Sequence, residues 1–472
     1  MLRGEWMALS RKGKGLSATV ALLGGAWMRL AMLKALPQVT GDTLLYGNLA
    51  KNLLHGRFAL TDGSGVAHAT LIRLPGYPLC LALCFRLFGI DNYTAVSYLQ
   101  IGLELAGCAL LADFVRRIAG DRAALFTLWV AALCPFTASY AVAPLTETPT
   151  LFAIALALWA MERFLGLPGW RSALAFTFAI ASAALLRPDG ALVGVVLAPA
   201  LLIGLKGMRG LTPSVFRMGA VCLLLALLPF SVWTARNWRV FHVIEPLAPR
   251  YATDPGESTN PGWQRWMKTW CLDFVSTSDI YWNVPGSTFD VSKLPNRAFD
   301  SQAQRAETES IAAAYNDNGQ DLSVELDARF GRLAAERIQA DPLRYYLWLP
   351  LGRMADMWLR PRVENLNIDS DWWVYSHHNA ETRFSWAYAA LNATYLLLAL
   401  AGLCLRPRYW PWMLLYFVLR SALLMTIEAP EARYTLECFP MLFALGGIAL
   451  AAGSQKLAGQ LHPEPARNSP RQ

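Results

Sequence analysis

The chain has 472 residues, of which 55% are hydrophobic and only 16% are charged. Because an ordinary soluble domain carries about a quarter of charged residues, this composition is that of a membrane protein. The formal net charge of +8 does not indicate nucleic-acid binding, since most Lys and Arg residues stand in short links between apolar runs and form no basic stripe on a soluble surface.

Apolar runs that are long enough to cross a hydrocarbon core of about 30 Å recur along the sequence. We therefore predict an all-α polytopic membrane protein with about ten transmembrane helices. The predicted spans are Leu16–Leu36, Thr94–Val115, Ala123–Val142, Pro149–Leu165, Ser172–Leu186, Gly190–Leu205, Met218–Ala235, Trp386–Leu405, Tyr409–Ile427 and Leu436–Ala452.

The links between these spans alternate in charge. With the N-terminus inside, every predicted inside link is short and basic, as the positive-inside rule requires. These links contain Arg11, Lys12 and Lys14; Arg116, Arg117 and Arg122; Arg163 and Arg171; Lys206, Arg209 and Arg217; Arg406 and Arg408; and Lys456, Arg467 and Arg471. The pattern places both chain ends in the cytoplasm.

Two long segments lie on the outer side in this scheme. The first outer loop, 37–91, ends in a short apolar run that Arg86 interrupts, and we expect interfacial helices there. The second segment is a large outer region, 241–385, with an amphipathic helical pattern over Leu322–Ala340. Within it, Leu343–Leu359 is either an interfacial helix or a further crossing. The predicted organisation is an N-terminal membrane module (1–240), the outer region (241–385), C-terminal helices (386–454) and a disordered cytoplasmic tail (455–472).

Charged side chains gather at the outer ends of the spans. Ionisable groups at a membrane boundary cost free energy, so each of them requires a reason. For one residue, snorkelling or helix capping is a sufficient reason, but a whole set on one face favours a binding site. The set comprises Asp42, Arg73, Glu147, Arg187, Asp189, Arg236, Glu428, Glu431 and Arg433. Glu104 and Arg420 fall within predicted spans, where we expect them to pair with other helices.

Several short motifs carry a family resemblance. In the first outer loop, Asp42 is followed by Tyr46, then by Arg73-Leu74-Pro75-Gly76-Tyr77-Pro78 and Phe88-Gly89. Later motifs are Leu145-Thr146-Glu147, Leu186-Arg187-Pro188-Asp189-Gly190, Trp233 with Arg236-Asn237, and Glu431-Ala432-Arg433-Tyr434. In order and spacing they resemble the GT-C glycosyltransferases, in particular the protein O-mannosyltransferase and aminoarabinose-transferase-like group, glycosyltransferase family 39. The resemblance does not extend to 251–342.

The resemblance implies a GT-C-like helix bundle that transfers a sugar from a polyprenyl-phosphate donor to an acceptor hydroxyl on the outer face, with inversion. By motif position, Asp42 is the catalytic base, and Glu147 is a catalytic carboxylate that either orients the acceptor or shares in holding a metal. Thr43 stands where many relatives have a second acidic residue. Donor-phosphate binding is assigned to Arg433, Arg187, Arg73 and Arg236, and further substrate contacts to Tyr46, Tyr77, Tyr434 and Glu431. A bacterial inner membrane is expected as the location.

The chemistry of these residue types agrees with the assignment. The departing phosphate gains negative charge, and an Arg side chain binds phosphate with two hydrogen bonds and stays protonated. Partial burial is expected to raise the pKa of Asp42 toward neutrality. The role of a divalent metal stays open, and His377-His378, near Asp369 and Asp371, is interpreted as part of a solvated loop.

Two other classes of function remain as alternatives. A lipid or polysaccharide transporter or flippase would also line a cavity with charge, although the sequence shows no internal repeat of the kind that many transporters have. A non-catalytic envelope-assembly protein would use the outer region to bind partners. The sequence does not identify the sugar, and the acceptor is a protein, a lipid head group or a glycan.

Overall fold

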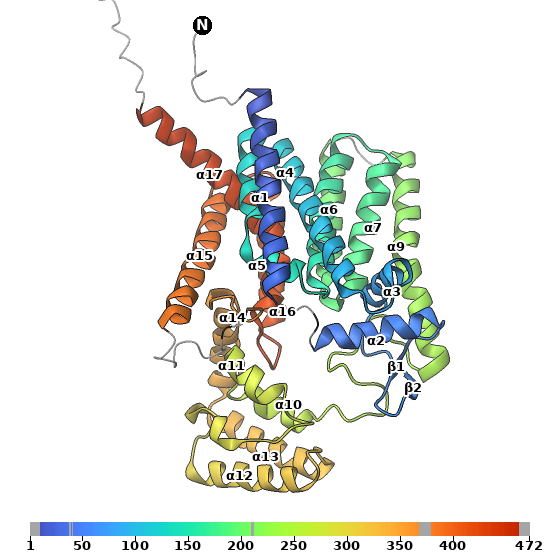
Figure 1. Cartoon of the computed structure of the whole chain (residues 1–472), viewed down its shortest axis with the longest axis vertical. Helices are drawn as coiled ribbons and strands as arrows, with labels where there is room; N and C mark the ends of the chain where they lie inside the picture. The colour runs from blue at the N-terminus through green and yellow to red at the C-terminus, as the bar shows by residue number, and fades with distance from the viewer. Residues whose placement is uncertain are drawn as a thin grey trace, which may run out of the picture.

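The structure is a computed structural model that describes residues 10–36, 39, 41–208, 212–366, 368 and 379–461. Long helices lie side by side in the upper part of Figure 1, and a smaller set of helices lies below them. The apolar helices of the upper part are α1 (Arg11–Ala35), α4 (Tyr93–Ala132), α6 (Glu147–Gly166), α7 (Trp170–Leu186), α8 (Ala191–Met208), α9 (Pro213–Phe241), α15 (Asn379–Cys404), α16 (Trp410–Leu424) and α17 (Phe439–Leu461). The predicted all-α polytopic membrane protein is confirmed.

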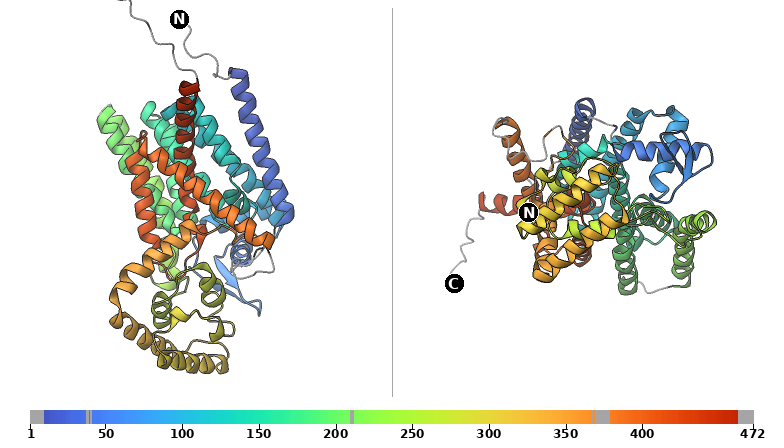
Figure 2. Two further views of the ribbon diagram at one scale, coloured as in Figure 1. Left: turned by 90° about the vertical axis from the view of Figure 1, so that its left-hand side faces the viewer. Right: turned by 90° about the horizontal axis from the view of Figure 1, so that it is seen from below.

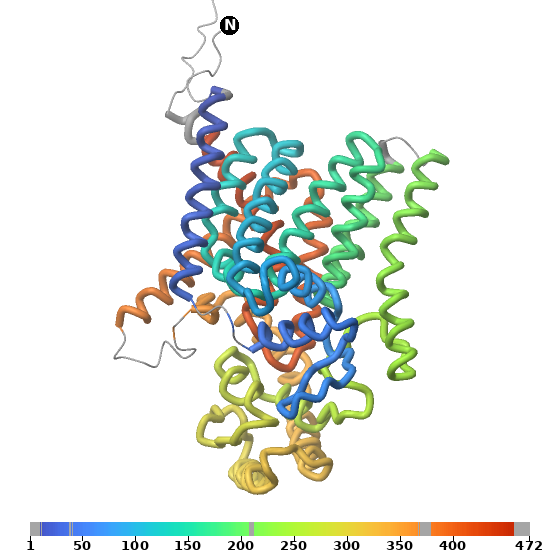
Figure 3. The backbone as a smooth tube through the Cα atoms, turned by 45° about the vertical axis from the view of Figure 1, so that its right-hand side comes forward, coloured from blue at the N-terminus to red at the C-terminus, as the bar shows by residue number. Residues whose placement is uncertain are grey.

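Seven helices in the described part of the chain are long and apolar enough to cross a membrane, and α7 and α16 are shorter apolar helices in the same bundle. The core of the bundle is built around α4, α6 and α17, with buried side chains such as Phe114, Leu158 and Phe439. In contrast, α9 stands at the edge of the bundle (Figure 3) and buries only Met218, Trp233 and Asn237. Its other side chains are exposed or partly exposed.

The predicted span Ala123–Val142 crosses as a broken helix. Gly120, with φ of 87°, separates two helical segments of α4, and a positive φ costs glycine little. The second segment then runs back along α1. Lys14 of α1 pairs with Asp121 at one end of this segment, and Arg29 of α1 donates to the carbonyl of Ala132 at the other end. Helix α4 ends at Ala132, and the short helix α5 (Pro135–Ala141) completes the crossing. A proline in the first turn of α5 marks the break, since its nitrogen has no proton to continue the α4 hydrogen bonds.

Ion pairs show that the basic links share one face of the bundle. Arg408, between α15 and α16, pairs with Glu162 near the end of α6 at 3.0 Å. Arg163 approaches Asp113 of α4 to 3.8 Å. Together with the Lys14–Asp121 pair, these contacts join four links that the charge pattern placed on the same side.

The first outer loop folds against the opposite end of the bundle. It contains α2 (Asp42–Leu54), an antiparallel hairpin of β1 (Ala59–Thr61) and β2 (Ala67–Ala69), and α3 (Gly76–Phe88). Helix α2 lies across the direction of the long helices (Figure 1), as expected of an interfacial helix. Asn48 and Asn52 of α2 bond to the backbone and hydroxyl of Thr61, so the hairpin and α2 form one unit.

The outer region has its own small core. Its helices are α10 (Pro261–Lys268), α11 (Phe274–Ser276), η3 (Thr277–Tyr281), η4 (Val291–Lys293), η5 (Asn296–Ala298), α12 (Gln302–Asp317), α13 (Val324–Ala340), η6 (Arg344–Trp348) and α14 (Leu349–Leu359). Trp263, Trp266 and Trp270 recur at the spacing of one helical face. Trp263 and Trp266 pack against Phe330 of α13, and Trp270 packs against Trp266. The amphipathic pattern therefore predicted α13 well, and Figure 2 shows this region as a separate layer.

A short segment after α14 joins the outer region to the bundle. The buried guanidinium of Arg362 donates to Asn392 of α15, to the carbonyl of Ala432 at 2.9 Å and to the hydroxyl of Thr435 at 2.5 Å. Asn365 donates to the carbonyl of Ser139 in α5. The segment 361–366 thus contacts three membrane elements. Residues 369–378, which include His377 and His378, and the tail 462–472 lie outside the described residues.

A buried ion pair holds α1 against α4. The side chain of Arg29 has no exposed surface; its Nε donates to Glu104, and its Nη1 donates to the carbonyls of Gly25 at 2.9 Å and Ala132 at 2.6 Å. The expected pairing of Glu104 within the bundle is confirmed. Because a lone charge is costly in an apolar interior, both partners must be present together.

Glu104→Gln is expected to destabilise the protein by about 3–5 kcal/mol, because it leaves the Arg29 guanidinium buried without its counter-charge. The melting temperature of the purified protein in detergent measures this effect. Asp121→Asn, which breaks an exposed pair with Lys14, is the control and should cost at most about 1 kcal/mol. Equal melting temperatures for Glu104→Gln and the control would contradict the prediction.

Candidate active site

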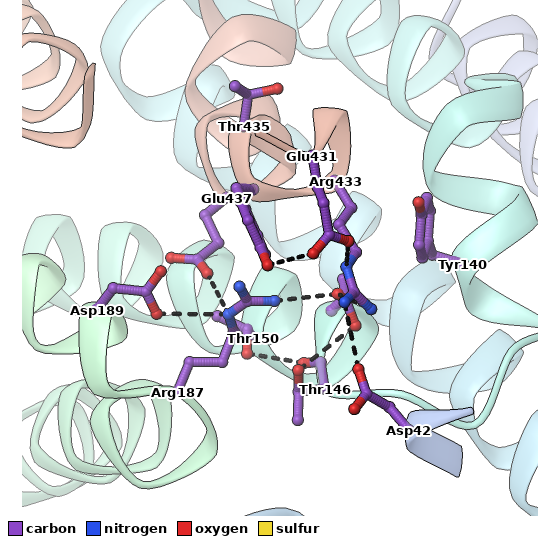
Figure 4. A network of polar contacts seen from close by, with 12 residues as sticks. Asp42, Tyr140, Thr146, Thr150, Arg187, Asp189, Glu431, Arg433, Thr435 and Glu437 are labelled. Atoms are coloured by element: carbon purple, nitrogen blue, oxygen red, sulfur yellow. Dashed lines mark hydrogen bonds and ion pairs between the residues drawn. The ribbon is translucent and has the colours of Figure 1, made fainter. Parts of the chain in front are cut away.

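Asp42 lies at the start of α2, at the end of the bundle away from the basic links. Gly41 precedes it with φ of 45° and ψ of −114°, a backbone conformation that glycine adopts without strain. From this start of α2 the Asp42 side chain is directed at the bundle, where it meets residues of the late loop 431–438 (Figure 4).

The accessible end of the site is an ion-pair cluster around Asp42. Its Oδ1 is 3.1 Å from Nη2 of Arg73, and its Oδ2 is 3.2 Å from Nη2 of Arg433. The Nε of Arg433 lies 2.6 Å from Glu431, whose other oxygen accepts the hydroxyl of Tyr434. Residues separated by almost 400 positions in the sequence therefore meet here.

Glu147 connects this end to a deeper layer. It stands at the start of α6, where a carboxylate is favoured by the helix dipole, and it is almost fully buried. Its Oε1 lies 3.0 Å from Nη1 of Arg187 and 3.8 Å from Nη1 of Arg433. Glu147 thus stands between the two guanidiniums.

In the deeper layer, buried carboxylates alternate with buried guanidiniums. The Nε of Arg187 lies 2.9 Å from Glu437 and 3.4 Å from Asp189. Both carboxylates also pair with the fully buried Arg420, at 2.9 Å and 2.6 Å respectively. The expected pairing of Arg420 is confirmed. The turn η2 (Pro188–Gly190) directs Asp189 inward, and it needs Gly190 because a Cβ there would lie 2.1 Å from the carbonyl of Ala183.

Glu437 is an acidic site residue that was not identified from the sequence. It lies in η7 (Ala432–Cys438), inside the run Leu436–Ala452 that was predicted as a plain span. A glutamate one residue inside an apolar run was the available signal, because an ionisable group there needs a partner.

Exposure decreases steadily through the cluster. The side chains of Asp42, Arg73 and Arg433 are 31%, 26% and 20% exposed, whereas Glu437 is 2% exposed and Arg420 is fully buried. A substrate that approaches from outside the bundle therefore meets Asp42 with its two guanidiniums first, and the deeper pairs hold these groups from behind.

The pKa of Asp42 moves in the opposite direction to the expectation. Burial alone raises it, but the guanidiniums of Arg433 and Arg73 outweigh burial, through charge and hydrogen bonds, and hold the pKa below its ordinary value. The prediction of a raised pKa was wrong because the sequence did not reveal that two cations share this carboxylate.

The three predicted substrate tyrosines occupy different surroundings. Tyr434 contacts Glu431, and its ring lies near the guanidiniums of Arg433 and Arg187. Tyr77 is buried, and its hydroxyl donates to Gln100. The half-buried Tyr46 packs edge-on against the ring of Tyr77 with 5.1 Å between centroids. Sequence reasoning did not select Tyr140, which faces Arg433 across the site in Figure 4 and donates to Glu364.

Arg236 lies apart from the cluster. Its guanidinium donates to the carbonyls of Phe58 and Thr70, both at 2.7 Å, and lies over the rings of Phe58 and Trp233. It therefore joins α9 to both ends of the β-hairpin and, through the hairpin, to α2. The structure gives Arg236 a bracing contact and does not bring it to Asp42.

Arg236→Ala is expected to loosen the first outer loop, because two charge-assisted hydrogen bonds to its backbone are lost. Amide hydrogen exchange of peptides covering 56–71 should speed up by at least tenfold, which corresponds to about 1.4 kcal/mol. Peptides of α13 should not change. Unaltered exchange over 56–71 would show that Arg236 does not brace the loop.

No group of three or more His, Cys, Asp or Glu in the described part of the chain is arranged to hold a metal ion. Glu428, another acid from the outer set, pairs with Arg250 at 2.9 Å and with Lys268 at 3.4 Å, and no described ion pair joins it to Asp42 or its partners.

Comparison with known proteins relates the first half of the chain to one enzyme family. Residues 68–233 match the sequence profile described as dolichyl-phosphate-mannose-protein mannosyltransferase. This range includes Arg73, Glu147 and Arg187, and it ends before Arg236. No curated protein matches the chain.

Three solved structures of low sequence identity are similar to the chain to different degrees. The apo oligosaccharyltransferase of Archaeoglobus fulgidus aligns with a TM-score of 0.50 and 13% identity, over 99% of this chain and 54% of that one. ArnT of Cupriavidus metallidurans, bound to undecaprenyl phosphate, has a TM-score of 0.39 and 15% identity, over 98% and 82%. The yeast Pmt1–Pmt2 complex, bound to its sugar donor, has a TM-score of 0.38 and 18% identity, over 50% and 34%.

The chain spans about half the length of the archaeal enzyme and about a third of the yeast chain. Residues 68–233 thus match the pattern of this mannosyltransferase family, and the chain shares the fold of the archaeal oligosaccharyltransferase.

Proposed function

We propose that this protein transfers a sugar from a polyprenyl-phosphate donor to an acceptor hydroxyl at the outer face of the membrane, with inversion at the anomeric carbon. The observation that carries the proposal is Asp42, a carboxylate held between Arg73 and Arg433 at the accessible end of the cluster. Attack by a hydroxyl requires a base, and departure of a phosphate requires positive charge to stabilise it. Here the carboxylate and the guanidiniums lie within hydrogen-bonding distance of each other.

In the proposed reaction, Asp42 takes the proton of the acceptor hydroxyl while the oxygen of that hydroxyl forms a bond to the anomeric carbon. The bond from that carbon to the phosphate oxygen breaks, and its electron pair stays on the polyprenyl phosphate. Arg433 and Arg73 stabilise the charge that develops on the phosphate. Arg187 stands behind Glu147, which is proposed to orient the acceptor and to keep the two guanidiniums apart.

The class of donor rests on the family profile over residues 68–233, whose description names a lipid-phosphate mannose. A donor with a long apolar tail also suits a site at the end of a helix bundle, because the tail can stay in the bilayer while the phosphate reaches Arg433. We propose a bacterial inner membrane as the location, with both termini cytoplasmic, and a protein, lipid or glycan as the acceptor.

The test uses the purified full-length protein in nanodiscs with a panel of radiolabelled polyprenyl-phosphate sugars and membrane extract as the source of acceptor. A transferase should release polyprenyl phosphate in proportion to the label that appears on the acceptor. A flippase would move the labelled lipid between leaflets of a vesicle with the sugar bond intact. An assembly protein would do neither, and either of these results would replace the proposal.

A further inference from the structure

We propose that the donor phosphate and Asp42 use the same two guanidiniums, so that donor binding releases Asp42 from its ion pairs and makes it available as a base. The inference rests on the proposed function, and it adds an order to the reaction: the donor must bind before the acceptor hydroxyl can be deprotonated.

Both oxygens of Asp42 are occupied in the structure. Arg73 bonds to Oδ1 and Arg433 bonds to Oδ2, each through an Nη2 nitrogen, at 3.1 Å and 3.2 Å. A general base must accept a proton through one of these oxygens, within about 2.6–3.2 Å of the hydroxyl. Two cations also hold the pKa of Asp42 below its ordinary value, and a lower pKa weakens a base.

The same two guanidiniums are the ones that a phosphate can reach. Arg73 and Arg433 keep 26% and 20% of their side chains exposed, whereas Arg187 is 13% exposed and Arg420 is fully buried. Apart from Asp42, the guanidinium of Arg73 bonds only to its neighbouring carbonyl, that of Ile72, among the described contacts. It can therefore exchange one anion for another at low cost.

The net charge of the cluster favours replacement of Asp42 by the phosphate over binding of the phosphate in addition to Asp42. Five carboxylates, Asp42, Glu147, Asp189, Glu431 and Glu437, face four guanidiniums, Arg73, Arg187, Arg420 and Arg433. A phosphodiester that joins this cluster adds a further negative charge to a site of low dielectric constant. Asp42 is the most exposed of the five and hence the one that can leave its partners.

The charged and titratable groups around Asp42 determine whether affinity for the phosphate rises or falls with pH. They are Arg73 from its own loop, Arg433 and Glu431 from the late loop, Glu147 from α6, and Tyr46 from α2. When phosphate takes the two guanidiniums, the pKa of Asp42 rises, so the complex binds a proton more readily than the free protein does. Affinity for the phosphate should therefore be highest at low pH and fall as the pH rises through the pKa of Asp42 in the complex.

Asp42→Asn supplies the test, with the full-length protein in nanodiscs and the methyl ester of undecaprenyl phosphate as the probe, because this phosphodiester, like the donor, keeps a single charge as the pH changes. Since the variant removes the anion that competes for Arg73 and Arg433, it should bind the probe about tenfold more tightly than the native protein, and its affinity should lose the pH dependence. Arg73→Gln should bind the probe more weakly. Asp91→Asn is the matched control, because Asp91 is an exposed acid of the same outer layer that pairs with Lys51, and asparagine tolerates its left-handed φ of 59°.

Equal or weaker binding of the probe by Asp42→Asn would overturn the inference. If that variant does not fold, the native protein still decides the question, because an affinity that is independent of pH would also overturn it. The proposed function fails in a different way: Asp42→Asn would keep its transferase turnover, or the native protein would transfer no sugar, whatever the binding results are.

Discussion

Asp42→Asn is expected to lower the rate of sugar transfer by about 10²–10⁴-fold, the range that a general base contributes. Asparagine has nearly the same shape as aspartate and can still meet Arg73 and Arg433 through its amide oxygen. It cannot take the proton of the acceptor hydroxyl, however, so the loss should fall on kcat. The measurement is release of polyprenyl phosphate per unit time at saturating donor.

The control for this prediction is Asp91→Asn, which changes the charge of the outer layer by the same amount and lies outside the cluster. Its rate should stay within a factor of two of the native rate, the scale expected for one exposed ion pair. A rate for Asp42→Asn within tenfold of native would exclude Asp42 as the base and would direct attention to Glu147 or Glu431.

Arg433→Lys is expected to reduce kcat/KM for the donor by about 10²-fold, corresponding to roughly 2–3 kcal/mol, the upper range of a hydrogen bond to a charged group. In the structure, one guanidinium reaches Asp42, Glu431 and Glu147 through three different nitrogens. Lysine keeps the positive charge but has a single nitrogen on a flexible stem. It therefore cannot contact the three carboxylates at once or bind a phosphate with two parallel hydrogen bonds.

Arg250→Lys is the control for Arg433→Lys, because Arg250 is a half-exposed arginine of the outer region that pairs with Glu428. Its effect on kcat/KM should be less than threefold. If both substitutions reduce kcat/KM alike, the fork geometry of Arg433 has no special role, and a general loss of positive charge at the outer face would explain the result.

The membrane fold was largely predictable because its main signals are local. A helix that crosses the bilayer must be apolar along its whole length, and Lys or Arg in the links reports the side on which each link lies. The pairs of Arg408 with Glu162 and of Lys14 with Asp121 agree with that assignment. Hydropathy did not reveal the break at Leu133 and Cys134, because a broken helix and a straight one need equally apolar sequences.

The site was predictable as a set of residues but not as a geometry. Motif order selected Asp42, Glu147, Arg187 and Arg433, and the structure brings these four together. Arg236 has the same chemistry as Arg433 and also ends a span, yet it braces the hairpin, because the partner of a guanidinium depends on contacts that are distant in the sequence. The lowered pKa of Asp42 depends on distant contacts in the same way.

The attachment of segment 361–366 determines where the chain can be cut and rejoined. Arg362 and Asn365 are held by Ala432, Thr435 and Ser139, so this stretch belongs mechanically to the membrane part although it follows the outer helices in the sequence. A chimaera that grafts another outer region onto this scaffold should place its second junction before Pro361. A graft extended past Leu366 would remove the contacts that support the late loop. The chimaera would then be inactive, whichever acceptor the protein that supplied the graft prefers.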